Sequence, residues 1–445
     1  MNSRHDADTH DDTVLLRDVV RRHKAGEHIG ITSVCSAHPL VLQAAVEHAA
    51  ESGGTVLIEA TSNQVDQTGG YTGLRPADFR DLVLDMADAA SLPRERVILG
   101  GDHLGPNRWR SLPPAEAMSH ADELVRAYVR AGFTKIHLDC SFSCEGDPTP
   151  LTDELVAERS ARLIAVAEEA AGPDGSGRLD YVIGTEVPVP GGAHHTIDAL
   201  SPTAPEAARD TMQAHRDAFD RAGVAAVWPR VAALVVQPGV EFDHQQVFAY
   251  QPEPARELSA VLDDEPAMVF EAHSTDYQSE QALHALVRDH WAILKVGPQL
   301  TFALREALFG LAAIEDELVP EPERSNLVEV IEQRMLAEPG QWKGYYTGTE
   351  LEQRVNRRYS YSDRLRYYWP DPAINAAQDQ LLANLSAVRI PLPLISQHLS
   401  AQYERVRDGE LPATPHALAL DHVKDVLRTY ARACTSDHST EEQDS

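Results

Sequence analysis

The sequence predicts an α/β protein, a (β/α)8 TIM barrel with an all-helical C-terminal appendage. Eight short runs rich in β-branched residues lie between residues 29 and 297, and a helical pattern follows nearly every one. Strands that alternate with helices favour a parallel sheet, and eight consecutive units favour a closed barrel over an open sheet. Several runs end on Asp, His, Glu or Lys, which is where such barrels carry their catalytic groups.

The predicted elements alternate regularly along the chain. The strands cover residues 29–35, 55–61, 97–103, 134–140, 180–187, 231–237, 268–273 and 292–297. The helices cover residues 39–51, 76–90, 115–131, 152–171, 205–222, 254–262, 279–289 and 301–318. Each helix carries apolar residues at positions i, i+3 and i+4, and several begin at Pro or Thr and end near Gly.

The alternation stops after Val319, where helical patterns broken by Pro and Gly take over. We therefore divide the chain into a disordered N-terminus (1–12), a barrel (13–319), a helical C-terminal region (320–435) and a disordered tail (436–445).

Composition excludes several classes of function. The 445 residues carry 39 basic and 69 acidic side chains, and the net charge of −30 repels nucleic acid and anionic membrane surfaces. The four cysteines match neither a zinc ribbon nor a disulfide framework. The polar N-terminus does not resemble a signal peptide, and no apolar run is long enough to span a bilayer. We expect a cytoplasmic oligomer in which a sugar phosphate would need a locally basic pocket.

Asp102 and His103 end the third strand, in the segment GGDHLGPN. An imidazole suits zinc or another divalent ion, and a neighbouring carboxylate can act as a base. We therefore take Asp102 as a candidate catalytic base and His103 as a candidate metal ligand. The alternative is structural: His103 caps the next loop while Asp102 binds backbone N–H groups.

Three further acids and one histidine end later strands. Glu271 and His273 are two residues apart, so both point to one side of their strand, as a metal-ligand pair or as a buried hydrogen-bonded pair. Glu186 is a candidate general acid or a salt-bridge partner within the barrel mouth. Asp139 shares a strand face with His137, and because it is the nearer of the two to the strand end we take it as a further candidate catalytic residue that reaches the substrate.

Lys295 ends the eighth strand, where it could form a Schiff base if burial depressed its pKa. We favour the interpretation that Lys295 forms ion pairs, because several acidic side chains converge on the same end of the barrel. Gln237 ends the sixth strand, where a three-histidine zinc site would require an imidazole, and an amide is a poor zinc ligand.

Other polar residues suit substrate recognition. An amide- and hydroxyl-rich mouth fits a polyol or a sugar, and free N–H groups at the start of the last barrel helix could hold a phosphate. The candidate substrate-binding residues are Glu59, Ser62, Asn63, Gln64, Gln237, Gly297 and Thr301. The segment 356–369 holds four Arg and four Tyr, a composition that we assign to subunit packing.

The same segments resemble a known family over residues 25 to 435. Those that carry the resemblance include LIEATSNQVDQTGGYTG, GGDHLGPN, GFTKIHLDCS, YVIGTEVPVPGGA, VFEAHSTDYQ, LKVGPQLTFALREALF and YSYSDRLRYYW. They are similar to the D-tagatose-1,6-bisphosphate aldolase subunits called GatZ/KbaZ. The resemblance implies a barrel like that of class II aldolases. It also implies an accessory role in galactitol and N-acetylgalactosamine catabolism, supporting a catalytic GatY/KbaY-like aldolase.

A second hypothesis comes from the strand-end residues, because related barrels are sugar epimerases with a strand-end Asp-His pair. The chain would then be a stand-alone, metal-dependent ketose or ketose-phosphate C4-epimerase or aldolase. Asp102 would be the base, Glu186 the acid, and His103 and His273 ligands of a divalent metal, preferably zinc. No nucleotide-binding motif is present, so we do not expect kinase activity.

Overall fold

The computed structural model describes residues 16–184 and 200–435. Eight parallel strands form a closed barrel in the order β1-β10-β9-β6-β5-β4-β3-β2, which confirms the predicted fold. The strands are β1 (Ile31–Cys35), β2 (Val56–Thr61), β3 (Val97–Leu104), β4 (Lys135–Leu138), β5 (Asp180–Gly184), β6 (Val231–Val235), β9 (Val269–Ala272) and β10 (Ile293–Val296). β1 and β2 end where predicted and β3 runs one residue further, whereas β4, β6, β9 and β10 stop one or two residues short of their predicted ends.

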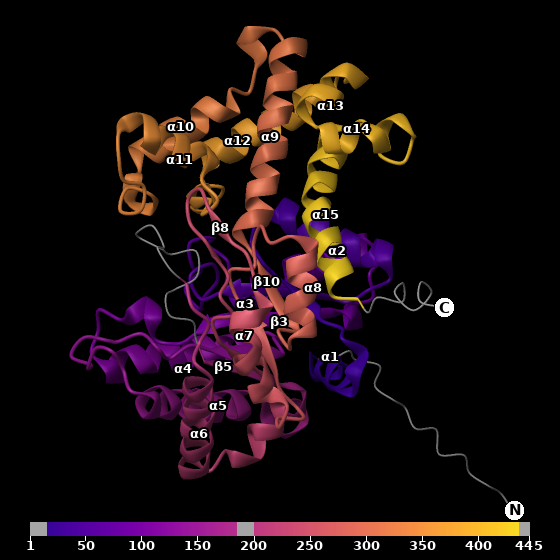
Figure 1. Cartoon of the computed structure of the whole chain (residues 1–445). Coiled ribbons are helices and arrows are strands. Elements are labelled where there is room, and N and C mark those ends of the chain that lie inside the picture. The colour runs from indigo at the N-terminus through magenta and orange to yellow at the C-terminus, as the bar shows by residue number, and fades with distance from the viewer. Residues whose placement is uncertain (1–15, 185–199, 436–445) are drawn as a thin grey trace, which may run out of the picture.

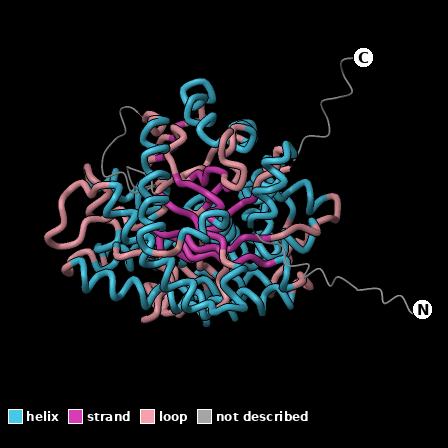
Figure 2. The backbone as a smooth tube through the Cα atoms, turned by 90° about the horizontal axis from the view of Figure 1, so that it is seen from below, coloured by secondary structure: helices cyan, strands magenta, loops and turns pink. Residues whose placement is uncertain are grey.

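Helices lie around the strands, which run through the middle of the view in Figure 2. They are α2 (Pro39–Ser52), α3 (Pro76–Ala89), α4 (Pro114–Arg130), α5 (Asp153–Gly175), α6 (Pro205–Ala222), α7 (Pro252–Ser259), α8 (Glu280–Arg288) and α9 (Pro298–Leu318). Proline opens most of them because its fixed φ suits the first helical turn. The sequence patterns did not predict the short hairpin β7 (Glu241–Phe242) and β8 (Val247–Phe248).

A short helix, α1 (Leu16–Arg22), covers the N-terminal end of the barrel. Its Leu16 and Val20 join an apolar cluster inside the barrel that includes Leu57, Ile98 and other strand residues. This end of the barrel interior is therefore mainly apolar. Most of the ionisable side chains described below lie toward the opposite end.

Asp180 is the exception at the apolar end, because its carboxylate is buried beside Arg17 of α1, 3.6 Å from the guanidinium. Burial raises its pKa to about 6, and the nearby arginine only partly opposes this. The folded chain therefore holds a proton that the unfolded chain releases near pH 4, so folding stability falls as the pH rises from about 4 to 6.

Asp180→Asn is accordingly expected to raise the free energy of unfolding by about 1–3 kcal/mol above pH 6 and to have little effect near pH 4. Urea unfolding at pH 4.5 and pH 8 measures this difference, with Asp18→Asn as a control in the half-exposed neighbouring acid. An equal gain at both pH values would contradict the assignment.

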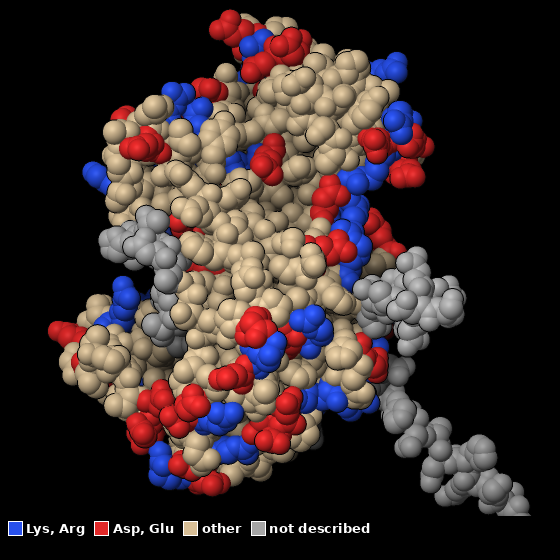
Figure 3. Space-filling view, in the orientation of Figure 1, with Lys and Arg blue, Asp and Glu red and all other residues tan. Residues whose placement is uncertain are grey.

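The C-terminal helices gather on one side of the barrel, at the top of Figure 1, and the long helix α9 leads to them. They are α10 (Leu327–Ala337), α11 (Glu350–Tyr359), α12 (Pro372–Ser386), α13 (Leu392–His398) and α14 (Ser400–Arg407). Charged side chains of both signs lie over the upper and lower parts of the visible face in Figure 3. None of the helices in residues 16–184 and 200–435 has the length and hydropathy needed to cross a bilayer.

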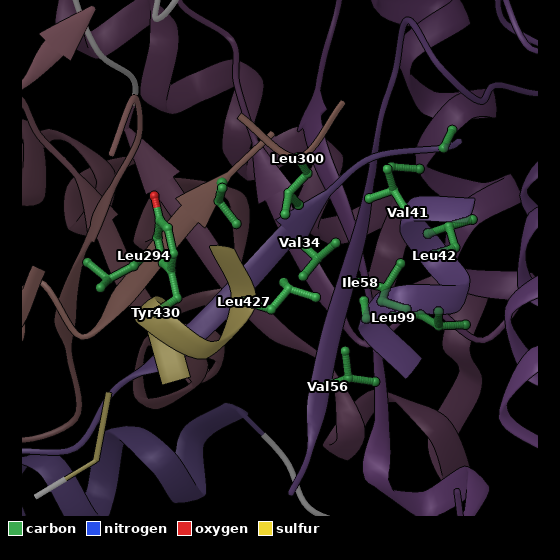
Figure 4. Close-up of a cluster of buried hydrophobic side chains, with 14 of the residues drawn as sticks. Val34, Val41, Leu42, Val56, Ile58, Leu99, Leu294, Leu300, Leu427 and Tyr430 are labelled. Carbon is green, nitrogen blue, oxygen red and sulfur yellow. The ribbon is translucent and has the colours of Figure 1, made fainter. Parts of the chain in front are cut away.

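The last helix, α15 (Pro415–Ala433), returns to the barrel and packs against α2, α8 and α9. Figure 4 shows Leu427 beside Val34 of β1, and Tyr430 near Leu294 of β10. The Tyr430 hydroxyl donates a hydrogen bond to the Thr275 carbonyl at 2.7 Å. Thus α15 forms part of the helical wall. The division at residue 319 stays an interpretation of the sequence.

Candidate active site

A cavity of about 860 Å³ opens at the carboxyl ends of the barrel strands. Its floor is made by strand-end residues, among them Cys35, Asp102, His103, Asp139, His273 and Lys295. Its roof comes from the C-terminal region, through Arg366, Tyr367, Trp369 and Gln378. The helices above the barrel therefore take part in the site.

Two imidazoles of the floor, those of His103 and His273, lie against the fully buried ring of His137, and we call the three residues the histidine cluster. Their ring centroids lie 4.9, 5.0 and 5.4 Å apart. One ligand atom from each ring and one carboxylate oxygen of Asp102 lie within 4.8 Å of one another. The sequence did not identify His137 as a ligand, and the third imidazole comes from β4 rather than from the end of β6.

Local backbone geometry explains why Asp102 and His103 both face the cavity. Neighbouring residues on a regular strand point to opposite faces. His103, however, has a φ of 50°, in the left-handed region that non-glycine residues rarely adopt. The turn brings the His103 ring toward Asp102, whose carboxylate lies 3.7 Å from Nε2. Such a conformation is typical of functional sites.

Each histidine of the cluster is held by hydrogen bonds, and both ring nitrogens of His137 are engaged, because its Nδ1 also bonds to Asp102 at 2.8 Å. His103 Nδ1 bonds to Asp139 at 2.8 Å, His137 Nε2 to the Gly184 carbonyl at 3.1 Å, and His273 Nε2 to Glu271 at 2.9 Å. Burial opposes the charge on Asp139, but the hydrogen bond from His103, the charges of the neighbouring imidazoles and a hydrogen bond from Ser141 together lower the Asp139 pKa to about 2. Burial lowers the pKa of His273 to about 3, so its imidazole is neutral.

A chain of buried ion pairs lies beneath the cluster. Lys135 Nζ contacts Glu59 and lies 2.6 Å from Glu271, and Lys295 Nζ contacts Glu59 and lies 2.9 Å from Asp102. Burial alone would lower the pKa of Lys295, but Asp102 and Glu59 raise it well above its usual value. Lys295 is therefore an ammonium ion, as the ion-pairing interpretation expected, and cannot act as a Schiff-base nucleophile.

The remaining candidates have varied positions. Asn63, Gln64, Gly297 and Thr301 line the cavity. Glu59 and Glu271 are fully buried. Ser62 donates its hydroxyl to the His103 carbonyl and so supports the strand-end turn. Gln237 is not among the residues lining the cavity. Its Oε1 accepts bonds from Gly239 and Val240 N–H groups and orders the loop after β6. Glu186 lies outside the described residues.

The N–H groups at the start of α9 are not free, contrary to expectation. Asp276 Oδ1 accepts bonds from Gly297 and Gln299 N–H groups at 3.0 and 2.8 Å. The Thr301 hydroxyl bonds to Asp363 of the C-terminal region. A carboxylate of the protein thus occupies the place where the sequence predicted a phosphate.

The sequence did not predict the roles of Lys135 and of the Arg366–Tyr367 pair. Lys135 shares the strand face of His137 and Asp139, so the period-two spacing contained a signal for it. Arg366 and Tyr367 belong to the Arg- and Tyr-rich segment assigned to subunit packing, yet they line the cavity. Only the tertiary fold reveals that contact.

Comparisons with known proteins agree with this geometry. A family model described as D-tagatose-1,6-bisphosphate aldolase subunit GatZ/KbaZ-like matches residues 16–435. The chain is similar to the crystal structure of a probable tagatose 6 phosphate kinase from Sinorhizobium meliloti 1021. The two are 51% identical, the match covers 91% of this chain and 100% of the other, and the TM-score is 0.85.

Two aldolase structures are much more distant. The YdjI aldolase from Escherichia coli K12 is 15% identical, with 81% of this chain and 94% of that chain covered and a TM-score of 0.39. A fructose-bisphosphate aldolase from Campylobacter jejuni is 13% identical, with 88% and 94% covered and a TM-score of 0.42. At these scores neither bears on function.

Proposed function

The chain belongs to the GatZ/KbaZ-like family of D-tagatose-1,6-bisphosphate aldolase subunits, and on that premise we propose that its own barrel mouth binds a divalent metal and a ketose phosphate for aldol-type chemistry at C4. The observation that carries the proposal is the histidine cluster, with Asp102 beside it at the floor of a sugar-sized cavity. Such chemistry includes both cleavage of the C3–C4 bond and epimerisation through cleavage and re-addition.

The donor set of the histidine cluster fits a divalent ion, preferably zinc. Each ring has a hydrogen bond to a carboxylate or a carbonyl, which is the usual support for metal-bound histidines. The histidine cluster and Asp102 would hold the ion, which would replace the hydrogen bond between His137 Nδ1 and Asp102. When bound, it would stabilise negative charge that develops on the ketose oxygens.

The chain's own residues would handle the proton and the orientation of the substrate. Asp102 is ionised because Lys295 and the neighbouring histidines hold its pKa well below the usual range against the effect of burial. It lines the cavity and can accept the proton of the C4 hydroxyl as the C3–C4 bond breaks. Asn63 and Gln64 would bind sugar hydroxyl groups, and Glu186 remains the predicted acid.

We test this proposal by measuring bound metal, aldol cleavage and C4 epimerisation with tagatose and fructose, each free and phosphorylated. His103→Ala and His273→Ala are expected to lower the metal content from about one ion per chain to below a tenth and to abolish turnover. The control His416→Ala removes a cavity histidine outside the cluster and should keep the metal. Unchanged metal content in both cluster variants would refute the proposal.

We further propose that the chain associates with a catalytic class II aldolase subunit through one face of α11. Leu351, Val355 and Tyr359 recur every four residues on this helix and are 68%, 44% and 55% exposed. We call them the α11 stripe. Exposed apolar groups of this kind mark protein interfaces, and tyrosine is frequent at their energetic centres. The membership in a family of aldolase subunits supports the choice of partner.

The double variant Leu351→Asp/Val355→Asp should weaken association with a GatY/KbaY-like aldolase at least about tenfold in sedimentation experiments. Val388→Asp alters an exposed apolar residue outside the stripe and serves as the control. If the stripe variant instead changes only self-association, the stripe joins copies of this chain and the assigned partner is wrong.

A further inference from the structure

Arg366 lines the cavity, and the proposed chemistry does not use it. It projects from the roof, in the turn η9 (Arg364–Tyr367), and lines the cavity together with Tyr71 and Tyr367. The aromatic rings of these two tyrosines meet edge to face at 5.1 Å. The guanidinium lies 4.6 Å from the Tyr367 ring centroid, so the side chain is held in place by stacking.

The hydrogen bonds of Arg366 go only to neutral acceptors. Its N–H groups donate to the Ser362 carbonyl, to the Asp363 carbonyl at 3.1 Å and to the Tyr367 hydroxyl at 3.1 Å. Within residues 16–184 and 200–435, no carboxylate oxygen lies within 4.0 Å of its guanidinium. In contrast, the cavity's Lys295 is neutralised by Glu59 and Asp102.

Two further groups in the cavity are buried without a hydrogen-bond partner among the described residues. They are the hydroxyl of Ser274, which is 5% exposed, and Oε1 of Gln378, which is 8% exposed. Ser274 follows His273 directly, so a hydroxyl donor is available next to the histidine cluster. Polar groups buried in this way need a partner, and a bound ligand would provide one.

We propose that Arg366 and Tyr367 form an anion subsite for the phosphate of a phosphorylated sugar, while the carbonyl end of the sugar lies toward the histidine cluster. This subsite rests on the proposed function for the identity of the sugar. A phosphate needs a concentrated positive charge in a chain of net charge −30, and the planar guanidinium offers paired N–H donors to its oxygens. The start of α9 cannot serve, because Asp276 already occupies it.

The subsite gives the C-terminal helices a role in selectivity. The barrel floor would process the ketose, and the roof would select its phosphorylated form over the free sugar. The sequence interpretation of segment 356–369 as a packing surface is thereby revised for Arg366 and Tyr367.

Calorimetry on the full chain without added metal tests the subsite, with inorganic phosphate, fructose 6-phosphate and fructose as probes. Arg366→Gln should weaken binding of both phosphate probes about 30-fold and leave fructose unchanged. Arg366→Lys keeps the positive charge but not the paired N–H donors, so it should weaken phosphate binding less than Arg366→Gln does. Arg354→Gln removes an exposed arginine of α11 and should bind like the wild type. Equal loss for fructose and fructose 6-phosphate would mean that Arg366 is merely structural.

A second measurement on the unmodified chain covers the case in which the variants do not fold. Phosphate should protect Arg366 from modification by phenylglyoxal, as mapped by mass spectrometry, and an unprotected Arg366 would overturn the subsite. The two proposals fail separately. If phosphate binding depends on Arg366 but the chain binds no metal, the subsite stands and the proposed metal site is wrong. If turnover depends on metal but Arg366→Gln leaves it unchanged, the metal site stands and the subsite is wrong.

Discussion

Lys135→Met is expected to lower the free energy of unfolding by about 3–5 kcal/mol, because it leaves Glu271 buried without its lysine and Glu59 with Lys295 alone. Lys135 is fully buried, and an isolated buried carboxylate is far more costly than a paired one. Urea unfolding followed by circular dichroism at pH 8 measures the loss. Lys343→Met removes an exposed lysine and should change stability by less than about 0.5 kcal/mol.

The pH dependence gives this prediction a second check. In the native chain, burial opposes ionisation of Glu271, but Lys135, together with His273 and Lys295, keeps the Glu271 pKa below its usual value. Without Lys135 the carboxyl takes up a proton at higher pH, so the variant recovers stability relative to the wild type as the pH falls. A deficit that is equal at pH 8 and pH 5 would contradict the ion-pair explanation.

Truncation after residue 413, which removes α15, is expected to abolish cooperative folding. Leu418, Leu420, Val423, Leu427 and Tyr430 are buried against the barrel wall. Each contributes about 1.5–3 kcal/mol, so together they match or exceed the net stability of a typical domain. The measurements are near-ultraviolet circular dichroism and size-exclusion chromatography.

A chain that ends at residue 435 keeps α15 and is the matched control. It should give the same unfolding transition as the full chain. If the chain ending at 413 retained a native near-ultraviolet spectrum and a sharp transition, α15 would be an appendage rather than part of the wall.

The strands and their helices were predictable because hydrophobic periodicity and turn residues act locally. The spacing of Lys135, His137 and Asp139 places them on one strand face, but only closure of the barrel brings His137 toward His103 and His273. The same holds for Glu59, which meets Lys135 and Lys295 from strands separate in sequence. Pairing between distant segments carries no local signal.

The positions of the C-terminal helices were even harder to predict than those of the strand-end residues. The helices themselves were predictable from their apolar spacing, but their destinations were not. The pattern of α15 is that of any amphipathic helix, and nothing in it distinguishes a place beside β1 from a place above the barrel. Likewise, the composition of segment 356–369 fitted a subunit interface as well as it fitted a ligand cavity.

The position of α15 also sets the order of events during synthesis. Val34 on the first strand packs beside Leu427 of α15, almost four hundred residues later in the chain. The outer face of β1 is therefore covered only after α15 has left the ribosome. A nascent chain arrested before residue 415 should therefore expose the seam between α2 and α8 to chaperones and proteases. We expect the barrel to acquire protease resistance only once α15 has emerged, in one late step, rather than strand by strand.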